Sequence, residues 1–188
     1  MRVTGGEYGG RRIVVPPGEI RPAMDRMRES VFSILGSALG SLEGVTVLDL
    51  FSGSGSMALE ALSRGARYAV LVERDRGKAD VVRQNLSYVE AARWKLVIAP
   101  VERYLKRAVA AAGLPFDLVF CDPPFRYPGK AGLLGRIAAA GVLNAKGQLV
   151  VHFPREDELG DDIVGLELVD TRAYGRSIVH MYEVTAGP

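Results

Sequence analysis

The apolar positions of this chain change between two spacings from about residue 45 onward. Short runs of apolar and β-branched residues alternate with longer segments in which apolar residues recur every three or four positions. The first spacing is typical of buried strands and the second of amphipathic helices. The pattern predicts strands at 45–51, 68–73, 95–99, 116–120 and 148–151, and helices at 56–64, 75–89, 101–112 and about 131–140. Strands that alternate with helices indicate an α/β fold with a parallel, doubly wound sheet.

Both ends of the chain depart from this alternation. Residues 166–171 and 178–184 are two apolar runs with no helical segment between them, which predicts a C-terminal antiparallel hairpin. The first residues contain glycine pairs at 5–6 and 9–10 beside short β runs, and a helix that starts with proline follows at 22–35. The sequence therefore predicts a small extension of β-turns and one helix over residues 1–40, and a main domain over residues 41–188.

Composition supports one compact domain with a small appendage. The chain has 188 residues, of which 48% are hydrophobic and 24% are charged, and this is enough apolar material for a packed core. A single cysteine excludes an internal disulfide framework, and with only two histidines we expect no metal site. No apolar run approaches the ~20 residues that a membrane span needs, and the first residues have no hydrophobic signal core. We expect a cytoplasmic protein.

The charge is unevenly distributed although the net charge is only +2. The first 28 residues contain no lysine and three acids, against six arginines: Arg2, Arg11, Arg12, Arg21, Arg26 and Arg28. A guanidinium has a planar set of donors that suits phosphates and base edges. Taken alone, such a cluster favours a solvated surface with some local ion pairs over a nucleic-acid contact.

The first predicted strand leads into a glycine-rich turn. Gly53, Gly55 and Ala58 have the G-x-G-x-x-A spacing after a strand and before a helix, and Glu73 follows Gly53 by twenty residues at the end of the second strand. This arrangement predicts a pocket for a nucleoside cofactor, with the acid on the ribose hydroxyls. Asp49, just ahead of the glycines, favours S-adenosylmethionine over a dinucleotide, because a carboxylate suits an ammonium group and repels a pyrophosphate.

The fourth predicted strand ends in Phe120-Cys121-Asp122-Pro123-Pro124-Phe125. Each proline fixes φ and lacks the N–H that a sheet ladder needs, so the chain leaves the sheet there. Asp122 is therefore expected at the carboxyl edge of the sheet, where open α/β folds bind ligands. A carboxylate, two rigid prolines and an aromatic ring can grip a flat base that carries an amine.

These motifs together resemble the RsmD family of bacterial enzymes. The resemblance covers nearly the whole chain and includes the glycine turns at 5–6 and 9–11, the arginine-proline opening at 21–32, the motifs at 49–55 and 120–125, and Tyr174-Gly175. It implies a Rossmann-like class I methyltransferase fold and S-adenosylmethionine as the cofactor. It also implies methylation of the exocyclic N2 amine of a guanine in 16S ribosomal RNA.

The resemblance assigns roles to particular positions. The cofactor would be held by Asp49, Phe51, Ser52, Gly53, Ser54, Gly55, Glu73, Arg74, Val101 and Asp122. The target base and the chemistry would fall to Asp122, Pro123, Pro124 and Phe125. The RNA would contact Arg11, Arg12, Arg21, Arg26 and Arg28. The expected partner is 16S ribosomal RNA or the assembling small subunit, and we expect a monomer.

The chain departs from the family pattern at two places. Ala23 and Met24 stand where the family usually has a threonine after the arginine-proline pair. Pro100 follows the third strand, where related enzymes often carry an acid that approaches the adenine amine. Only the backbone of Val101 or the side chain of Glu102 could take over that contact.

Other functions remain open at this point. A DNA adenine-N6 methyltransferase or another RNA amino methyltransferase would use almost the same Asp-Pro-Pro-aromatic motif. A dinucleotide oxidoreductase would explain the glycine turn, and a noncatalytic RNA-binding module would explain the arginines. We interpret His152 as a sheet-edge histidine and Cys121 as an inward-facing strand residue, neither of them a catalyst.

Overall fold

A computed structural model describes residues 1–16, 23–111, 115–157, 159 and 163–185. The chain divides into two compact units, Met1–Ala99 and Pro100–Pro188. The amino-terminal extension predicted for residues 1–40 lies within the first unit. Arg21 and Pro22 lie outside the described residues.

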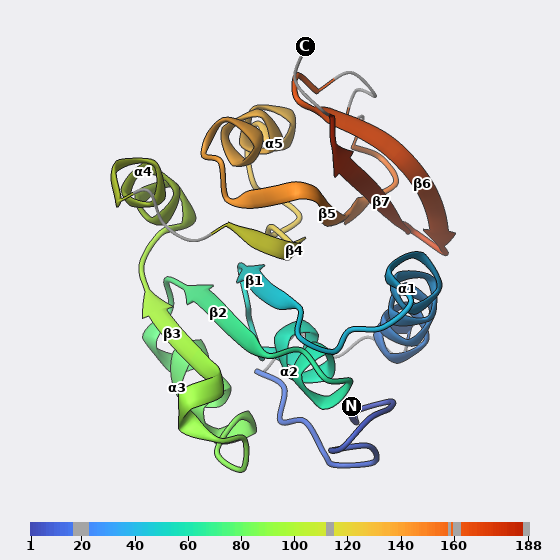
Figure 1. Cartoon of the computed structure of the whole chain (residues 1–188), viewed down its shortest axis with the longest axis vertical. Coiled ribbons are helices and arrows are strands. Elements are labelled where there is room, and N and C mark those ends of the chain that lie inside the picture. Colours follow the sequence, from blue (N-terminus) through green and yellow to red (C-terminus); the bar gives the residue numbers. More distant parts are fainter. Residues whose placement is uncertain (17–22, 112–114, 158, 160–162, 186–188) are drawn as a thin grey trace. The chain divides into compact units, whose positions relative to one another are not determined.

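The first unit is built on three parallel strands. In chain order its elements are α1 (Ala23–Leu39), β1 (Thr46–Leu50), α2 (Ser56–Ser63), β2 (Tyr68–Glu73), α3 (Arg76–Asn85), a 3₁₀ helix η1 (Ala91–Arg93) and β3 (Trp94–Ile98). The strands lie in the order β3-β2-β1 (Figure 1). The register pairs Leu50 with Val72 and Glu73 with Ile98, so the carboxyl ends of the strands meet at one edge. The turns that follow β1 and β2 are therefore neighbours.

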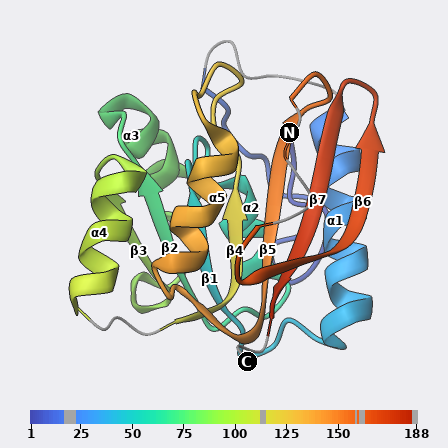
Figure 2. The same ribbon diagram turned by 90° about the horizontal axis from the view of Figure 1, so that it is seen from above.

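The second unit combines one parallel and two antiparallel strand pairs. Its elements are α4 (Val101–Ala111), β4 (Phe116–Cys121), α5 (Lys130–Ala139), β5 (Leu143–Pro154), β6 (Leu166–Tyr174) and β7 (Ser177–Val184). The strand order is β4-β5-β7-β6, with β4 and β5 parallel and the remaining pairs antiparallel. Helix α5 lies over one face of this sheet (Figure 2). The predicted C-terminal antiparallel hairpin is present as β6 and β7.

Burial explains why these segments form these elements. Leu48 and Leu50 in β1, Leu71 in β2 and Leu118 in β4 are fully buried. Such near-continuous apolar strands are typical of parallel sheets that are covered on both faces. Helix α3 begins at a capping residue, because the Asp75 carboxylate accepts the Lys78 N–H at 3.0 Å.

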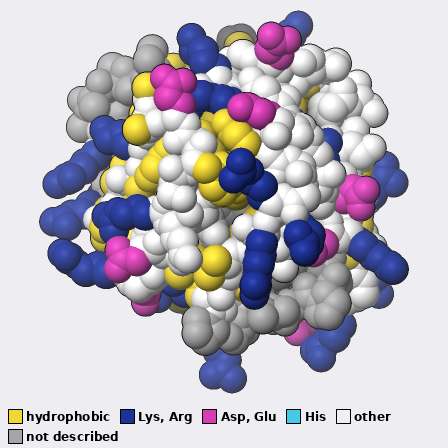
Figure 3. All heavy atoms as spheres, turned by 90° about the horizontal axis from the view of Figure 1, so that it is seen from below, with side chains coloured by type: hydrophobic (Ala, Val, Ile, Leu, Met, Phe, Trp, Pro, Cys, Tyr) yellow, Lys and Arg dark blue, Asp and Glu magenta, His cyan; other side chains and the backbone are white. Residues whose placement is uncertain are grey.

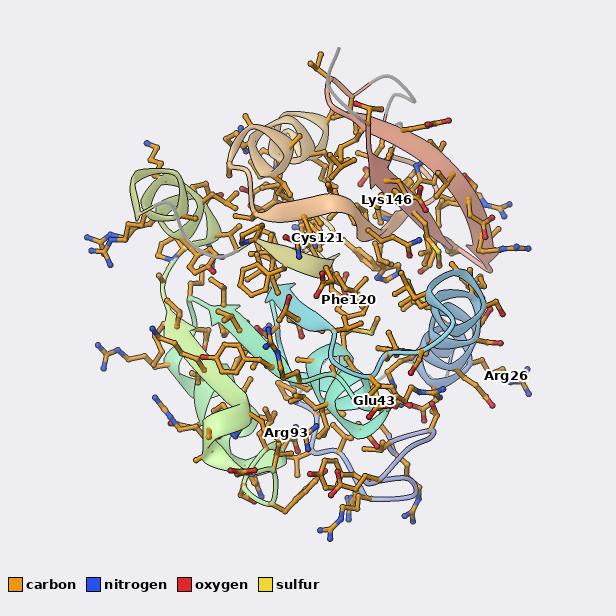
Figure 4. The ribbon with its side chains drawn as sticks, viewed as in Figure 1. Arg26, Glu43, Arg93, Phe120, Cys121 and Lys146 are labelled. Atoms are coloured by element: carbon orange, nitrogen blue, oxygen red, sulfur yellow. The ribbon has the colours of Figure 1, made fainter. Side chains whose placement is uncertain are left out.

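Several predicted boundaries were wrong. The helix predicted at 22–35 continues to Leu39, and the strand predicted at 166–171 continues to Tyr174. The helix predicted at 75–89 ends at Asn85, and the chain then turns toward η1. The strand predicted at 148–151 runs from Leu143 to Pro154. An irregularity in its pairing with β4, where Lys146 has a φ of 64° (Figure 4), separates Leu143 from the apolar run and hides the early part of the strand from a periodicity argument.

The amino-terminal extension is fastened to α2 by one buried carboxylate. Glu60 is fully buried. It accepts hydrogen bonds from the Thr4 N–H at 2.8 Å and the Thr4 hydroxyl at 2.6 Å, and from Arg28 Nε at 3.1 Å and Arg64 Nε at 2.9 Å. Burial acts to raise the pKa of Glu60, but the Thr4 and Arg64 hydrogen bonds and the Arg28 charge outweigh it and lower the pKa below its usual value. The ionised carboxylate therefore joins the extension, α1 and α2.

Close packing adds a second attachment at the end of α2. The Ser63 carbonyl accepts the Glu7 N–H at 2.7 Å, and its hydroxyl accepts the Tyr8 N–H at 2.9 Å. A Cβ on Gly6, whose φ is 77°, would lie 1.8 Å from the Ser63 carbonyl oxygen. The first glycine pair of the sequence is thus required by contact with α2.

We predict that Glu60→Gln lowers the free energy of unfolding by about 3 kcal/mol at pH 7, because Arg28 is then buried without its charge partner. The wild-type advantage should be complete above the usual carboxyl pKa of 4.5 and shrink as the pH falls below it, since the folded-state pKa is the lower one. Urea unfolding between pH 3.5 and 7 measures this difference. The exposed Glu43 (Figure 4) provides the control, because Glu43→Gln should change stability by less than about 0.5 kcal/mol. Equal effects of the two substitutions would contradict the role of Glu60.

Candidate active site

The turn between β1 and α2 has an unusual backbone. Phe51, Gly53 and Gly55 have φ values of 61°, 56° and 74°. The left-handed region costs glycine little but is strained for phenylalanine. Ser52 holds the turn in place, because its N–H donates to the Val72 carbonyl at 3.1 Å and its hydroxyl donates to the same carbonyl at 3.0 Å. The turn is therefore a rigid structure fastened to β2.

Glu73 joins the two turns at this sheet edge. Its Oε2 accepts the Gly53 N–H at 3.0 Å and its Oε1 accepts the Asp75 N–H at 2.8 Å. Each carboxylate oxygen can accept two hydrogen bonds, so a second acceptor position remains on each. The twenty-residue spacing in the sequence thus corresponds to a direct contact. The two carboxylate oxygens suit a ribose, because each is held in place and can accept a hydrogen bond from one of two neighbouring hydroxyls.

Asp49 is part of the scaffold of the same turn. Its side chain is buried, and its Oδ2 accepts the Ala58 N–H at 3.2 Å in the first turn of α2. A carboxylate at a helix N-terminus is stabilised by the helix dipole. The predicted contact between Asp49 and a cofactor ammonium stays a prediction. Arg74, which the resemblance also assigned to the cofactor, is exposed beside Glu73.

Gly55 is needed for packing, and its predicted contact with the cofactor stays a prediction. A Cβ at this position would lie 3.1 Å from Leu71, 3.3 Å from Leu86 and 3.4 Å from Val82. The missing side chain thus allows close packing of the turn against α3 and β2. Gly53 is the glycine whose backbone N–H lies at the candidate pocket, on the Glu73 carboxylate.

Sequence reasoning missed Asn85, which links three segments. Its Nδ2 donates to the carbonyls of Ser54 and Val14, both at 2.8 Å, and its Oδ1 accepts the Val14 N–H at 2.8 Å. One buried amide therefore connects α3, the glycine turn and the amino-terminal extension. The signal in the sequence was an asparagine on the apolar face of a helix, between Val82 and Val89.

The second group of predicted residues lies after β4. The Asp122 side chain is 38% exposed, Pro123 is buried and Phe125 is 36% exposed. The Tyr127 N–H donates to the Pro124 carbonyl at 2.7 Å, which closes a turn. Asp122 and the Phe125 ring are thus presented to solvent from a turn with defined backbone geometry.

A buried lysine fixes the far side of this turn. Lys130 is 6% exposed at the start of α5, where its ammonium donates to the Phe125 carbonyl at 2.6 Å and pairs with the Asp157 carboxylate. The pairing neutralises the lysine charge, so its cost of burial is offset. Lys130 therefore serves to hold the aromatic residue in position.

His152 lies beside Asp122, which the sequence did not indicate. Its Nδ1 is 2.8 Å from Asp122 Oδ1, and its ring meets the Phe125 ring edge to face with centroids 6.2 Å apart. His152 lies near the carboxyl end of β5, which extends past the strand predicted at 148–151 and pairs this histidine with Val179 of β7. Cys121 is buried as predicted, at the end of β4 (Figure 4).

The beginning of α4 holds the candidates for an adenine contact. Val101 is buried, and Glu102 accepts a hydrogen bond from the Tyr127 hydroxyl. Burial, followed by the hydrogen bond to Glu102 and its charge, raises the pKa of Tyr127 above the usual value. The hydroxyl is therefore a stable donor at neutral pH. Glu102 links α4 to the turn after β4, which leaves the Val101 backbone as the candidate.

The predicted RNA-binding arginines differ in their surroundings. Arg11 and Arg12 are exposed, and the Arg11 guanidinium lies 4.3 Å from the centre of the Tyr88 ring. Arg26 projects outward from α1 (Figure 4). Arg28 is 1% exposed and is occupied by Glu60, by Asp25 at 2.9 Å and by the Arg2 carbonyl, so it serves the fold. Arg21 lies outside the described residues.

Lys and Arg side chains are spread over the face seen in Figure 3, with hydrophobic patches between them. Within the described ranges, no helix combines the length and the apolar character that crossing a membrane requires. The same ranges contain no group of three or more His, Cys, Asp or Glu side chains that could hold a metal ion.

Comparison with known proteins places the chain in a family. The family model described as conserved hypothetical protein 95 matches residues 1–183. YlbH of Bacillus subtilis (strain 168) is 32% identical over 184 residues, which cover 97% of this chain and 98% of YlbH. Ribosomal RNA small subunit methyltransferase D of Escherichia coli (strain K12) is 39% identical over 128 residues, which cover 67% of this chain and 61% of that protein.

The comparison of structures agrees over the full length. The solved structure of yhhF from Escherichia coli covers 100% of this chain and 99% of its own, with a TM-score of 0.84 and 29% sequence identity. The predicted α/β class, a mostly parallel sheet with a C-terminal antiparallel hairpin, is confirmed. The chain belongs to the family described as conserved hypothetical protein 95, the RsmD family of class I S-adenosylmethionine-dependent methyltransferases.

Proposed function

We propose that this protein transfers a methyl group from S-adenosylmethionine to the exocyclic N2 amine of a guanine in 16S ribosomal RNA of the small subunit. The observation that carries the proposal is the turn after β4, where the Asp122 carboxylate and the Phe125 ring are exposed on a backbone fixed by prolines and Lys130. The name of the Escherichia coli relative, a small-subunit ribosomal RNA methyltransferase, supports the choice of RNA.

The first unit would hold the ribose and the methionine part of the cofactor. Glu73 would receive the ribose hydroxyls, and the turn from Phe51 to Gly55 would surround the methionine part. The Val101 backbone, which belongs to the second unit, stays the candidate for the adenine. When bound, S-adenosylmethionine supplies an electrophilic methyl group on a sulfonium. The rigid attachment of the turn to β2 supports this role, because a pocket whose backbone is already ordered loses little entropy on binding.

The turn after β4 would bind the target base. The lone pair of a guanine N2 amine is delocalised into the ring, so it must be turned toward the methyl group before it can react. Asp122 and the Pro123 carbonyl would do this by accepting the two amine hydrogens, and Phe125 would stack on the extruded base. Asp122 Oδ1 faces His152, and no described residue donates to Oδ2, which is the oxygen available for the amine.

Asp122 would also favour the reaction electrostatically. Positive charge develops on the amine nitrogen as the new bond forms. A carboxylate that already accepts a hydrogen bond from this nitrogen stabilises that charge more in the transition state than in the ground state. The same carboxylate is placed to take the amine proton afterwards. Pro124 contributes by fixing the backbone between the carboxylate and the stacking ring.

The exposed arginines would bind the RNA backbone. Arg11, Arg12 and Arg26 carry this part of the proposal, since their side chains are exposed. Arg21 stays in the set on the sequence resemblance alone, and we leave Arg28 out because its guanidinium is buried in the Glu60 network. We further propose that the protein acts in the cytoplasm, as a monomer, on RNA of the assembling small subunit.

The direct test measures methyl transfer from labelled S-adenosylmethionine to small-subunit RNA, as naked RNA and as particles that lack the modification. We expect N2-methylguanosine at one site. Methylated adenine in RNA would favour another RNA amino methyltransferase, and transfer to DNA would favour a DNA adenine-N6 methyltransferase. Tight cofactor binding without transfer to either RNA substrate would contradict the proposed target.

Two substitutions should separate cofactor binding from methyl transfer. Asp122→Ala should lower kcat by about 100-fold or more and leave cofactor affinity nearly unchanged, because it removes a group that orients the amine and stabilises its charge. Glu73→Gln should weaken cofactor binding by about 10-fold or more, because it removes the negative charge and replaces one of the two acceptor oxygens by an amide NH₂ group. Calorimetry with S-adenosylhomocysteine and initial rates measure both effects. Asp80→Ala, on an exposed aspartate of α3, is the control.

The Arg11 and Arg12 contacts should appear in the salt dependence of RNA binding. Each arginine that leaves a phosphate lowers the slope of log K against log salt by about 1. We therefore expect Arg11→Gln/Arg12→Gln to bind RNA more weakly and with a slope that is flatter by about 2. Arg83→Gln, on an exposed arginine already paired with Asp80, should leave the slope unchanged. An unaltered slope in the double variant would mean that Arg11 and Arg12 do not contact phosphates.

A further inference from the structure

The Asp122 carboxylate has a protein partner that the sequence motif does not include. His152 Nδ1 lies 2.8 Å from Asp122 Oδ1. The two residues come from neighbouring parallel strands, because Asp122 directly follows β4 and His152 lies in β5, one residue after the Cys121–Val151 pair of the register. The histidine pairs with Val179 of β7, and the preceding residue, Val151, pairs with Cys121 of β4, so its ring is carried by a strand that is held in the sheet.

The contact with Asp122 indicates which nitrogen of the neutral His152 ring carries the hydrogen. An ionised carboxylate can only accept a hydrogen bond, so the nitrogen that faces it, Nδ1, must carry the hydrogen. Nε2 is buried and has no hydrogen-bond partner among the described residues. In the neutral ring this nitrogen is an unprotonated lone pair. The histidine therefore acts as a donor to Asp122, with its other nitrogen turned into the protein interior.

The His152 ring also contacts Phe125, the residue proposed to stack on the target base. The Phe125 ring meets the His152 ring edge to face, and Phe125 is itself 36% exposed. His152 thus lies against both side chains that the proposed function assigns to the guanine. An exposed aspartate without a partner would sample several rotamers, whereas a donor from a rigid strand selects one.

We propose that His152 is a positioning residue for methyl transfer: its Nδ1–H holds one oxygen of Asp122, so that the other oxygen faces the target amine. This inference rests on the proposed function. Transition-state stabilisation of this kind depends on geometry, and a misplacement of about 1 Å can cost about 100-fold in rate. The loss should fall on kcat, because Asp122 acts after the cofactor and the RNA are bound.

Two substitutions separate the donor from the ring. His152→Phe keeps an aromatic ring beside Phe125 and removes the Nδ1 donor. His152→Asn removes the ring, but its amide nitrogen takes about the place of Nδ1 and can still donate to Asp122. A purely structural role would make the asparagine variant the more damaged one, since it leaves more empty space in the protein interior.

The experiment compares kcat and KM for RNA and for S-adenosylmethionine in the wild type and both variants, with thermal unfolding as the check on folding. We expect His152→Phe to lose roughly 10- to 100-fold in kcat with little change in either KM. His152→Asn should recover a large part of that loss. If His152→Phe does not fold, His152→Gln replaces it, because its amide lies one bond further along the side chain and misses the Nδ1 position.

A second readout does not depend on activity. The chain contains only two histidines, so comparison with His152→Asn assigns the ring nitrogen signals of His152 in an NMR spectrum. We expect the Nδ1–H form in the wild type and its loss in Asp122→Ala. A wild-type ring in the Nε2–H form would overturn the inference.

The outcomes separate this inference from the proposed function. No methyl transfer by the wild type would overturn the proposed function and this inference with it. A wild type that transfers methyl groups, beside a folded His152→Phe variant with the same kcat, would overturn this inference alone. Greater damage in His152→Asn than in His152→Phe would also overturn it.

Discussion

The turns at the ends of parallel strands need acceptors for their backbone N–H groups, and carboxylates meet this need after β1 and β2. A turn that leaves a sheet has donors that no ladder partner satisfies, and a buried unsatisfied donor is costly. Asp49 accepts from the first turn of α2, and Glu73 accepts from the turn after β1 and from the residue that caps α3. The two acids that we propose for cofactor binding are thus also the groups that hold the backbone of these turns.

Contacts inside the fold also determine which charged residues are accessible. Glu60 and Arg28 are buried because they connect the amino-terminal extension with two helices, and a buried pair of this kind requires every partner to be present. Arg11 and Arg12, in the same extension, remain exposed. The extension therefore has an inner side that is held by Glu60 and an outer side that carries exposed guanidinium groups.

The turn after β4 is held in a different way. Its backbone is held from outside the motif, by Lys130 at the Phe125 carbonyl and by a hydrogen bond from Tyr127 to Pro124. Asp122 is therefore not needed to hold the turn and stays partly exposed, with a histidine on one oxygen. A carboxylate that is oriented but not buried is suited to act on a substrate.

The sequence by itself determined the alternation of strands and helices, the family, and the position of each motif at a strand end. It did so because apolar periodicity and proline and glycine stereochemistry are local properties. Three features were decided only by the tertiary structure. Gly55 packs against Leu71, Arg28 lies inside the protein, and His152 contacts Asp122 from the neighbouring strand. Each depends on residues that are at least sixteen positions apart in the chain and meet only through strand register or helix packing, which no local pattern records.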